Sequence, residues 1–414
     1  MRILAPLLAA TLGALAQTTV LTHATLIDGT GAAPLRDGAI VMSGGRIAAM
    51  VPAANLKTPV GAQVVDLTGK TIIPGIINAH GHISDDPVPK LRRYAQYGIT
   101  SVIGMGGDGD EQLKIRDDQH HITSTGGGDI KGARVYTVQQ RFEFEKDAPT
   151  PDAGRLKVED LFKKHADAVK VVVDDRRKTQ VKMRPEVTAA IIDQAHKHHM
   201  KAFAHIHDYD DAKLLMEQGI DMLAHQVRDR EVDDAFISLM KAKKVAITST
   251  LARELSSFVY ADSPAWLSDP FLGRFSDPKR IEIAKTQLKE QQSKLPDLAL
   301  NRMDFEIASK NFTKMLKAGV RMGLGTDSGP VPARFEGYFE HLEMELMVKN
   351  GMSCMQVIQA FSKTNSEALG IDKDYGTLAK GKVADLVVLD KNPLDDILNT
   401  HSINAVYIGG KKFE

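Results

Sequence analysis

The stretch that decides the fold is Ile72-Ile73-Pro74-Gly75-Ile76-Ile77-Asn78-Ala79-His80-Gly81-His82. An apolar run of this length, ending in polar residues, is typical of a buried strand. Residues i and i+2 of a strand point to the same side, so His80 and His82 face one way. Imidazole is a common transition-metal ligand, and two of them in register supply half of a metal site. The pattern therefore predicts a strand that presents two metal ligands at its carboxyl end.

Seven further strand-like runs follow this one, and they cover 99–105, 133–138, 168–174, 201–206, 222–226, 245–250 and 321–326. Helical patterns separate them, for example at 184–199, 232–244 and 340–348. Such alternation predicts an α/β protein, with a (β/α)8 TIM barrel over 75–372. A doubly wound sheet is the alternative, but no glycine-rich phosphate turn follows the first strand. The polar helical stretch 278–318 lies between the last two strands, where an insertion could cover the mouth.

The two ends of the chain have a different texture from the middle. Residues 17–74 and 373–414 consist of short apolar runs separated by turn signals such as Asp28-Gly29 and Gly409-Gly410. We therefore expect one small β-sandwich domain built from both ends.

Residues 1–16 form a targeting pattern. A charged start, Met1-Arg2, precedes an apolar run that ends in Ala14-Leu15-Ala16. This order is typical of a cleaved secretory signal peptide, and it predicts a periplasmic or secreted protein. A buried N-terminal helix is the alternative.

Composition limits the partners. The 414 residues carry 53 basic and 53 acidic side chains, and this balance disfavours nucleic acid as a partner. No later stretch is long and apolar enough for stable membrane insertion. The single cysteine, Cys354, cannot build a cysteine metal site, whereas fourteen histidines are available. A small-molecule substrate is the expected partner, and homo-oligomer formation is left open.

Polar residues at the ends of other predicted strands extend the metal site. Lys170 interrupts the apolar run 168–173, where a buried ammonium is costly unless it is paired or neutralised. Reaction with carbon dioxide would convert the amine into an anionic carbamate, although a lysine that snorkels from a strand end is the alternative. His205, His225 and Asp327 end the fifth, sixth and eighth strands. Together these positions favour a metal centre over a chance arrangement.

This constellation resembles the amidohydrolase superfamily over nearly the whole chain after residue 16. The resemblance rests on Thr25-Leu26-Ile27-Asp28-Gly29-Thr30-Gly31, on 74–82, and on Gly376-Thr377-Leu378-Ala379-Lys380-Gly381-Lys382-Val383-Ala384-Asp385-Leu386-Val387-Val388-Leu389-Asp390. It is strongest to the branch that holds imidazolonepropionase-like proteins and prolidase-type enzymes (Xaa-Pro or Xaa-Arg dipeptidases), with ochratoxin-type amidases nearby.

The resemblance implies a binuclear centre with two divalent ions, zinc in the first instance. One ion would be held by His80, His82 and Asp327. His205 and His225 would hold the other, and carboxylated Lys170 would bridge the two. A metal-bridged hydroxide would attack the substrate, and Asp327 would carry the proton to the leaving group.

The implied function is that of an exported amidohydrolase which cleaves an amide bond of a dipeptide or an N-acyl amino acid. Lactone, carbamate or phosphotriester hydrolysis on the same centre is the alternative within enzymes. A catalytically silent binding protein of this fold is the alternative outside them.

The sequence identifies the substrate-binding residues less clearly than it identifies the metal ligands. Relatives often carry Gly-Gly-His-Gly after the third strand, but 139–144 differ here, so no relative's substrate can be transferred. Polar residues in or just after the strands are the candidates, and an arginine among them could hold a carboxylate bidentately. A surface salt bridge is the alternative for each arginine. The candidates are Tyr136, Arg141, His207, Arg228 and Arg253.

Overall fold

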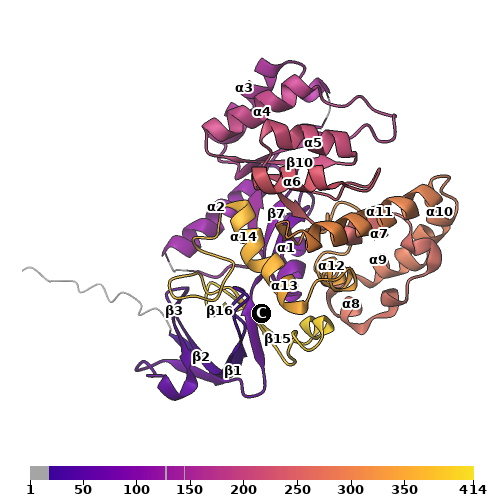
Figure 1. The fold of residues 1–414 in the computed structure, drawn as a ribbon. Helices are drawn as coiled ribbons and strands as arrows, with labels where there is room; N and C mark the ends of the chain where they lie inside the picture. The colour runs from indigo at the N-terminus through magenta and orange to yellow at the C-terminus, as the bar shows by residue number, and fades with distance from the viewer. Residues whose placement is uncertain (1–17, 126–127, 144) are drawn as a thin grey trace, which may run out of the picture.

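The computed structural model describes residues 18–125, 128–143 and 145–414 (Figure 1). The predicted signal peptide, residues 1–16, lies outside these residues. In the described part of the chain, no helix combines the length and apolar character needed to cross a bilayer.

The two chain ends share one mixed sheet. Its strands run in the order β16-β15-β14-β5-β1-β2-β3, with β4 paired to β1. The N-terminal members are β1 (Thr19–Leu26), β2 (Leu35–Ser43), β3 (Arg46–Pro52), β4 (Gln63–Asp66) and β5 (Thr71–Pro74). The C-terminal members are β14 (Leu386–Leu389), β15 (Ile403–Ile408) and β16 (Lys411–Lys412).

Strand β14 joins the two halves of this sheet, because it pairs antiparallel with β5. Figure 1 shows the indigo strands and the yellow C-terminal strands together at one side of the molecule. Strands from both chain ends thus share one sheet. The predicted sandwich is not confirmed, because these strands belong to a single hydrogen-bonded sheet.

The middle of the chain forms two parallel sheets. One contains β6 (Ile76–Gly81), β7 (Ile99–Gly104) and β8 (Arg134–Thr137). The other has the order β13-β12-β11-β10-β9, with β9 (Ala168–Val173), β10 (Lys201–Ile206), β11 (Met222–Leu223), β12 (Ala246–Thr248) and β13 (Met322–Gly323). Each of the strand-like runs read from the sequence contains one of these strands, which confirms the α/β class.

Isolated bridges connect the two parallel sheets at both seams. Gly81 pairs with Ser328, and Phe142 pairs with Val171. The arrangement is consistent with a barrel. The hydrogen bonding between strands is not continuous around it, so the prediction of a closed barrel is confirmed only in part. The seam beside β6 is the important one, since it brings the segment after β13 against His80 and His82.

Helices follow most strands and pack outside the parallel sheets (Figure 1). The first six are α1 (Pro87–Gln96), α2 (Asp110–Thr125), α3 (Pro151–Lys163), α4 (Pro185–Lys197), α5 (Tyr209–Gln218) and α6 (Asp234–Lys243). An excursion before β13 adds α7 (Leu251–Leu255), α8 (Pro270–Phe275), α9 (Pro278–Ile283), α10 (Lys289–Ser293) and α11 (Leu298–Lys317). The last are α12 (Tyr338–Lys349), α13 (Cys354–Gln359) and α14 (Asn365–Leu369).

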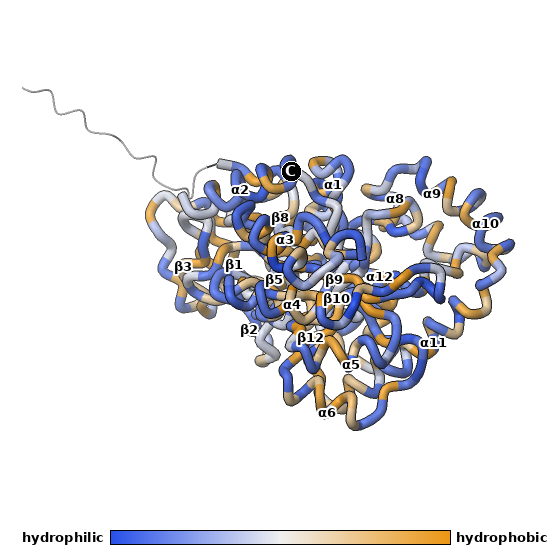
Figure 2. The backbone as a smooth tube through the Cα atoms, turned by 90° about the horizontal axis from the view of Figure 1, so that it is seen from above, coloured by the Kyte–Doolittle hydropathy of each residue, from blue (hydrophilic) through white to orange (hydrophobic). Residues whose placement is uncertain are grey.

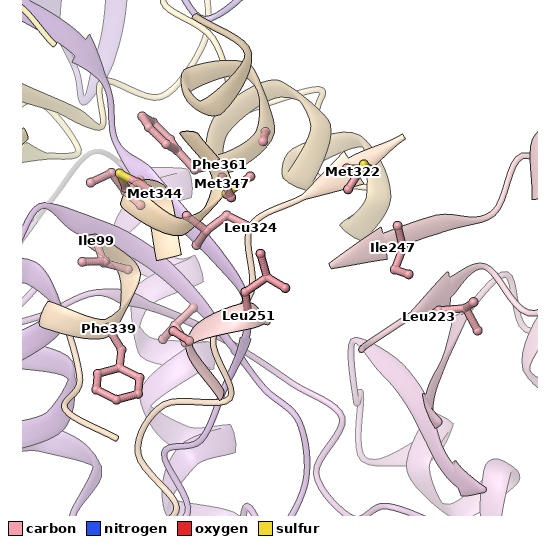
Figure 3. Close-up of a cluster of buried hydrophobic side chains, with 14 of the residues drawn as sticks. Ile99, Leu223, Ile247, Leu251, Met322, Leu324, Phe339, Met344, Met347 and Phe361 are labelled. Atoms are coloured by element: carbon pink, nitrogen blue, oxygen red, sulfur yellow. The ribbon is translucent and has the colours of Figure 1, made fainter. Parts of the chain in front are cut away.

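The hydrophobic core explains why these elements pack as they do. Helices such as α5, α6 and α11 alternate between polar and apolar residues along their length, as Figure 2 shows. Their apolar faces cover one side of the strands, and Figure 3 shows Leu223, Ile247 and Met322 of three neighbouring strands within one such cluster. The parallel strands are buried on both faces, so their sequences are almost continuously apolar. A polar residue in such a strand therefore stands out.

A buried ion pair ties the end sheet to the parallel strands. Arg134 of β8 donates from Nε to Asp385 Oδ2 at 2.7 Å and from Nη2 to Oδ1 at 3.1 Å. The two side chains are only 1% and 6% exposed. Removal of one member leaves the other charged, buried and unpaired, which typically costs about 3–5 kcal/mol.

We expect Arg134→Met to lower the free energy of unfolding by about that amount, measured by denaturant titration. The double variant Arg134→Met/Asp385→Leu should recover part of the loss, because neither charge then remains. Asp390→Asn, which affects a half-exposed pair with Lys70, is the matched control and should change stability little. Equal small effects of Arg134→Met and the control would contradict this interpretation.

Candidate metal centre and adjoining cavity

Strand alternation places Lys170 and His205 on the inner side of the sheet. Val169 and Val171 of β9 pack into the cluster covered by the helices. Ala168 of β9 and Phe203 of β10 instead belong to an inner cluster between the strands. Lys170 and His205 lie two residues beyond these inner residues and therefore share their side. The amine of Lys170 and the imidazole of His205 thus lie next to the inner cluster, on the side of the carboxyl ends of the strands.

Asp327 meets the two histidines of β6 across the seam. Its backbone N–H donates to the carbonyl of His80 at 2.8 Å, and its φ of 53° is in the left-handed region. This turn directs Oδ1 to His82 Nε2 at 2.8 Å and to His80 Nε2 at 3.4 Å. An aspartate tolerates this backbone conformation better than most residues, which suits the residue type to the place.

Hydrogen bonds fix which ring nitrogen of each histidine remains for a ligand. His80 Nδ1 donates to the carbonyl of Ala224 at 3.0 Å, which leaves Nε2. His225 pairs Nδ1 with the Thr250 hydroxyl at 3.1 Å and also leaves Nε2. His205 donates from Nε2 to Asp174 at 2.9 Å and leaves Nδ1. Partners of this kind orient the imidazoles of metal sites.

The electrostatics keep these imidazoles neutral, which is the form that binds metal. Burial, assisted by the nearby charge of Lys170, lowers the pKa of His80 to about 4. Burial also lowers the pKa of His205 and of His225 well below the usual value. Burial alone would raise the pKa of Asp327, but Arg334 and His80 outweigh it and hold that pKa well below its usual value.

Lys170 is the least satisfied group in this cluster. Its side chain is buried, and Nζ has no hydrogen-bond partner among the described residues. Burial lowers the pKa of Lys170 to about 7, so much of the amine is neutral near neutral pH. An orphaned, partly neutral amine beside histidine and aspartate side chains fits the predicted carbamate, which would turn it into an oxygen donor.

The donor set fits a metal ion. One ligand atom each from His80, His225 and Asp327 lie within 4.8 Å of one another. His82 touches Asp327, and the rings of His205 and His225 are 4.4 Å apart. The structure therefore brings the predicted histidine and aspartate ligands into one buried cluster, and the charge of Lys170 acts on His80 within it. His225 groups with His80 and Asp327, so the two ligand sets implied by the sequence adjoin.

Three residues that support this cluster were not found from the sequence. Arg334 donates to Asp327 Oδ2 and to its carbonyl, and Asp174 accepts from His205. Glu340 accepts from Asn78, Thr326 and Ser328 at 2.6–2.7 Å and so clamps the strand of His80 to the turn of Asp327. Burial raises the pKa of Glu340 to about 7. Little in the sequence distinguished Glu340, because the helical pattern 340–348 also contains His341, Glu343 and Glu345.

A cavity of about 490 Å³ adjoins the cluster, and α11 supplies part of its wall. Among the substrate-binding candidates, His207, Arg228 and Arg253 line it. The full lining comprises Asp174, Arg176, Arg177, Thr179, His207, Arg228, Arg253, Glu254, Ser257, Asp297, Leu300, Asn301 and Asp304. Asp174 and Arg253 connect it to the metal ligands, since Asp174 bonds His205 and Arg253 Nε lies 3.6 Å from Asp327.

The other two candidates lie elsewhere. Arg141 pairs with Glu143 at 2.7 Å and is not part of the cavity wall. Tyr136 is buried in the inner cluster and lines a separate cavity with Ala168 and Lys201, which begin β9 and β10. It therefore lies toward the amino ends of the strands, away from the metal ligands. This placement does not support the expected contact of Tyr136 with a substrate.

Comparisons with known proteins agree with this geometry. The model of the amidohydrolase family matches residues 71–413. Ochratoxinase from Aspergillus niger is 24% identical, over 96% of this chain and 87% of its own length. A candidate prolidase from Bifidobacterium longum superposes with a TM-score of 0.78 at 24% identity, covering 96% of this chain and 95% of its own. An Xaa-Pro dipeptidase solved with methionine in its active site gives 0.74 at 18%, covering 96% of this chain and all of its own.

The family match spans the parallel strands, the ligand cluster and the C-terminal part of the end sheet. The chain therefore belongs to the amidohydrolase family and is a hydrolase that acts on carbon–nitrogen bonds.

Proposed function

We propose that the protein hydrolyses the amide bond of a dipeptide or an N-acyl amino acid, with two divalent metal ions on a (β/α)8 scaffold. Zinc is the proposed metal. The observation that carries the proposal is Lys170, a buried amine without a partner amid histidine and aspartate ligands. When bound, such ions polarise a carbonyl oxygen and make a water molecule acidic enough to act as a nucleophile near neutral pH.

The chain's own residues would hold the ions in two adjoining sets. His80, His82 and Asp327 would form one set, and His205 with His225 the other. Lys170 Nζ would attack carbon dioxide: the nitrogen–carbon bond forms, one N–H proton leaves to solvent, and a carbamate remains. Its two oxygens would then link the sets.

Asp327 is the proposed proton carrier. Arg334 holds its Oδ2, which leaves Oδ1 directed toward the side of His80 and His82. The low pKa of this carboxylate keeps it ionised, so its oxygens carry no proton of their own before the reaction. It would take the proton released by the attacking water and deliver it to the nitrogen of the leaving amine.

The substrate class follows from the cavity and from the relatives together. Ochratoxinase, the prolidase and the dipeptidase are the proteins that resemble this chain, and the arginines in the cavity would suit an anionic substrate. A hydrolysis screen on metal-replete protein should cover dipeptides, N-acyl amino acids, lactones, carbamates and phosphotriesters. Turnover confined to the last three groups would replace the amide proposal. Absence of any bound metal would favour a silent binding protein.

We further propose that the protein is exported. The charged start and apolar run of residues 1–16 support this. N-terminal sequencing of mature protein from the native host should find a start at or near Gln17, and an intact Met1 on soluble cytoplasmic protein would refute export.

Elemental analysis tests the metal centre. Protein purified without chelator should contain close to two divalent ions per chain. Lys170→Ala should lose metal, because it removes the bridging group, and short carboxylic acids should partly restore binding by supplying oxygens. Lys114→Ala, at an exposed lysine on α2, is the control and should retain both ions. A wild-type content of one ion at most, in excess zinc and bicarbonate, would exclude the binuclear centre.

The variant Asp327→Asn tests the proton carrier. It keeps the shape and one oxygen but removes the base. We expect kcat to fall by about a hundredfold to ten-thousandfold, the range typical of general acid–base groups, while much of the metal remains. Asp262→Asn, at a half-exposed ion pair with Arg302, is the control. Turnover by metal-loaded Asp327→Asn at near the wild-type rate would move the role to another residue, with His207 the next to test.

A further inference from the structure

The cavity wall contains two arginines that share one buried glutamate. Glu254 is 2% exposed, and its Oε2 accepts from Arg253 Nη1 at 2.6 Å. The same oxygen lies 3.4 Å from Arg228 Nε. Arg228 is 1% exposed, and its Nη1 donates to the carbonyls of Ile206 and Gln226. Glu254 therefore holds both guanidinium groups in fixed positions at the inner end of the cavity.

These guanidinium groups retain donors that the described residues do not satisfy. Arg228 Nε and Arg253 Nε are buried without a hydrogen-bond partner. Arg228 Nε lies 3.4 Å from Glu254 Oε2 and Arg253 Nε lies 3.6 Å from Asp327 Oδ2, so both are in ion-pair rather than hydrogen-bond contact. The inner end of the cavity thus holds two guanidinium groups around one glutamate. Glu254 Oε1 also has no hydrogen-bond partner, whereas Oε2 contacts both guanidinium groups. The two positive charges exceed the single negative charge of Glu254, so their field favours an anion over an ammonium.

The acidic groups elsewhere in the cavity already face cations. Asp304 accepts from Arg177 at 2.8 Å and lies 3.4 Å from His207 Nε2. Asp297 accepts from Arg177 at 3.0 Å. Asp174 Oδ2 lies 3.7 Å from Arg176 Nη1 and also accepts from His205. A substrate ammonium would have to displace one of these partners, whereas a carboxylate would meet two guanidinium groups that share one glutamate.

We infer that Arg228 and Arg253, clamped by Glu254, form the subsite for a carboxylate on the leaving-group side of the scissile amide, and that the other side of the substrate carries no free ammonium. This inference rests on the proposed amide hydrolysis and deepens it. It selects an N-acyl amino acid over a dipeptide with a free amino terminus.

The distance to Asp327 sets the position of the carboxylate. Arg253 Nε lies 3.6 Å from Asp327 Oδ2, the residue proposed to protonate the leaving nitrogen. In an α-amino acid amide the carboxylate carbon is two bonds, or about 2.5 Å, from that nitrogen. A group held by Arg253 is therefore close enough to be the α-carboxylate of the departing amino acid.

Matched substrate triplets test the subsite. For each of several side chains X, the metal-loaded protein is assayed with N-acetyl-X, N-acetyl-X amide and glycyl-X. We expect kcat/KM to be at least tenfold higher for N-acetyl-X than for the other two, because the amide lacks the carboxylate and glycyl-X carries an ammonium. Equal hydrolysis of all three would overturn the subsite while leaving the proposed amide hydrolysis in place.

Variants then assign the effect to residues. Arg253→Gln should raise KM for N-acetyl-X about ten- to a hundredfold, the range for hydrogen bonds to a charged group, and should leave KM for N-acetyl-X amide within about threefold. Arg228→Lys should behave in the same way, since it keeps the charge opposite Glu254 but loses the planar fork. Arg155→Gln, at a half-exposed pair with Asp193, is the control and should change neither value. If the arginine variants raised KM equally for N-acetyl-X and for N-acetyl-X amide, the two arginines would have a structural role only.

Calorimetry on the metal-free protein separates this inference from the proposed function. N-acetyl-X should bind the wild type, and binding should weaken about ten- to a hundredfold in Arg253→Gln. If no amide is hydrolysed by loaded protein but this carboxylate-dependent binding persists, the hydrolysis proposal fails and the subsite stands. If binding is the same for N-acetyl-X, its amide and the variant, the subsite is excluded.

Discussion

Desolvation governs the character of this site. The inner side of the parallel strands is apolar below the ligands, and the helices seal the other side. Water cannot compensate charges there, so histidines lose their protons and the amine of Lys170 becomes a weak base. In this buried site, a side chain is stable only if it is neutral or if its charge is paired with an opposite charge. Burial therefore brings uncharged nitrogen atoms with free electron pairs close together. Such an arrangement favours the binding of a cation.

A buried carboxylate reinforces the geometry of the cluster. Glu340 of α12 bonds the strand that carries His80 and the turn that carries Asp327. A further bond to the backbone N–H of Gly337 satisfies its other oxygen. The two parallel sheets meet here through an isolated bridge rather than through a continuous ladder. Backbone bonds also cross this seam, such as Ala79 N–H to the Leu324 carbonyl at 3.1 Å and His82 N–H to the Ser328 carbonyl at 2.9 Å, and the bonds of Glu340 reinforce them.

The sequence was sufficient for features that are local in the chain. The run 168–173 specifies a strand, and a lysine within it is conspicuous because its neighbours are all apolar. The histidines and the aspartate could be placed because each ends such a run. Asp174 also ends such a run, 168–174, but its role shows only through its contact with His205. Arg334 could not be placed, since it lies in a loop and no strand pattern directs it toward Asp327. Tyr136 shows the opposite error: it is on the inner side of β8, but nothing in the sequence tells how deep that position is.

The pairing of β5 with β14 affects how the protein folds during its synthesis. Thr71–Pro74 must wait for Leu386–Leu389, more than three hundred residues later, before its hydrogen bonds on that side are formed. Such long sequence separation slows folding, because closing the long loop lowers the chain entropy before the new contact contributes any stabilising free energy. During synthesis the N-terminal strands would expose an open β edge, which is a template for self-association. A nascent chain that stalls before β14 is therefore the form most in need of a chaperone.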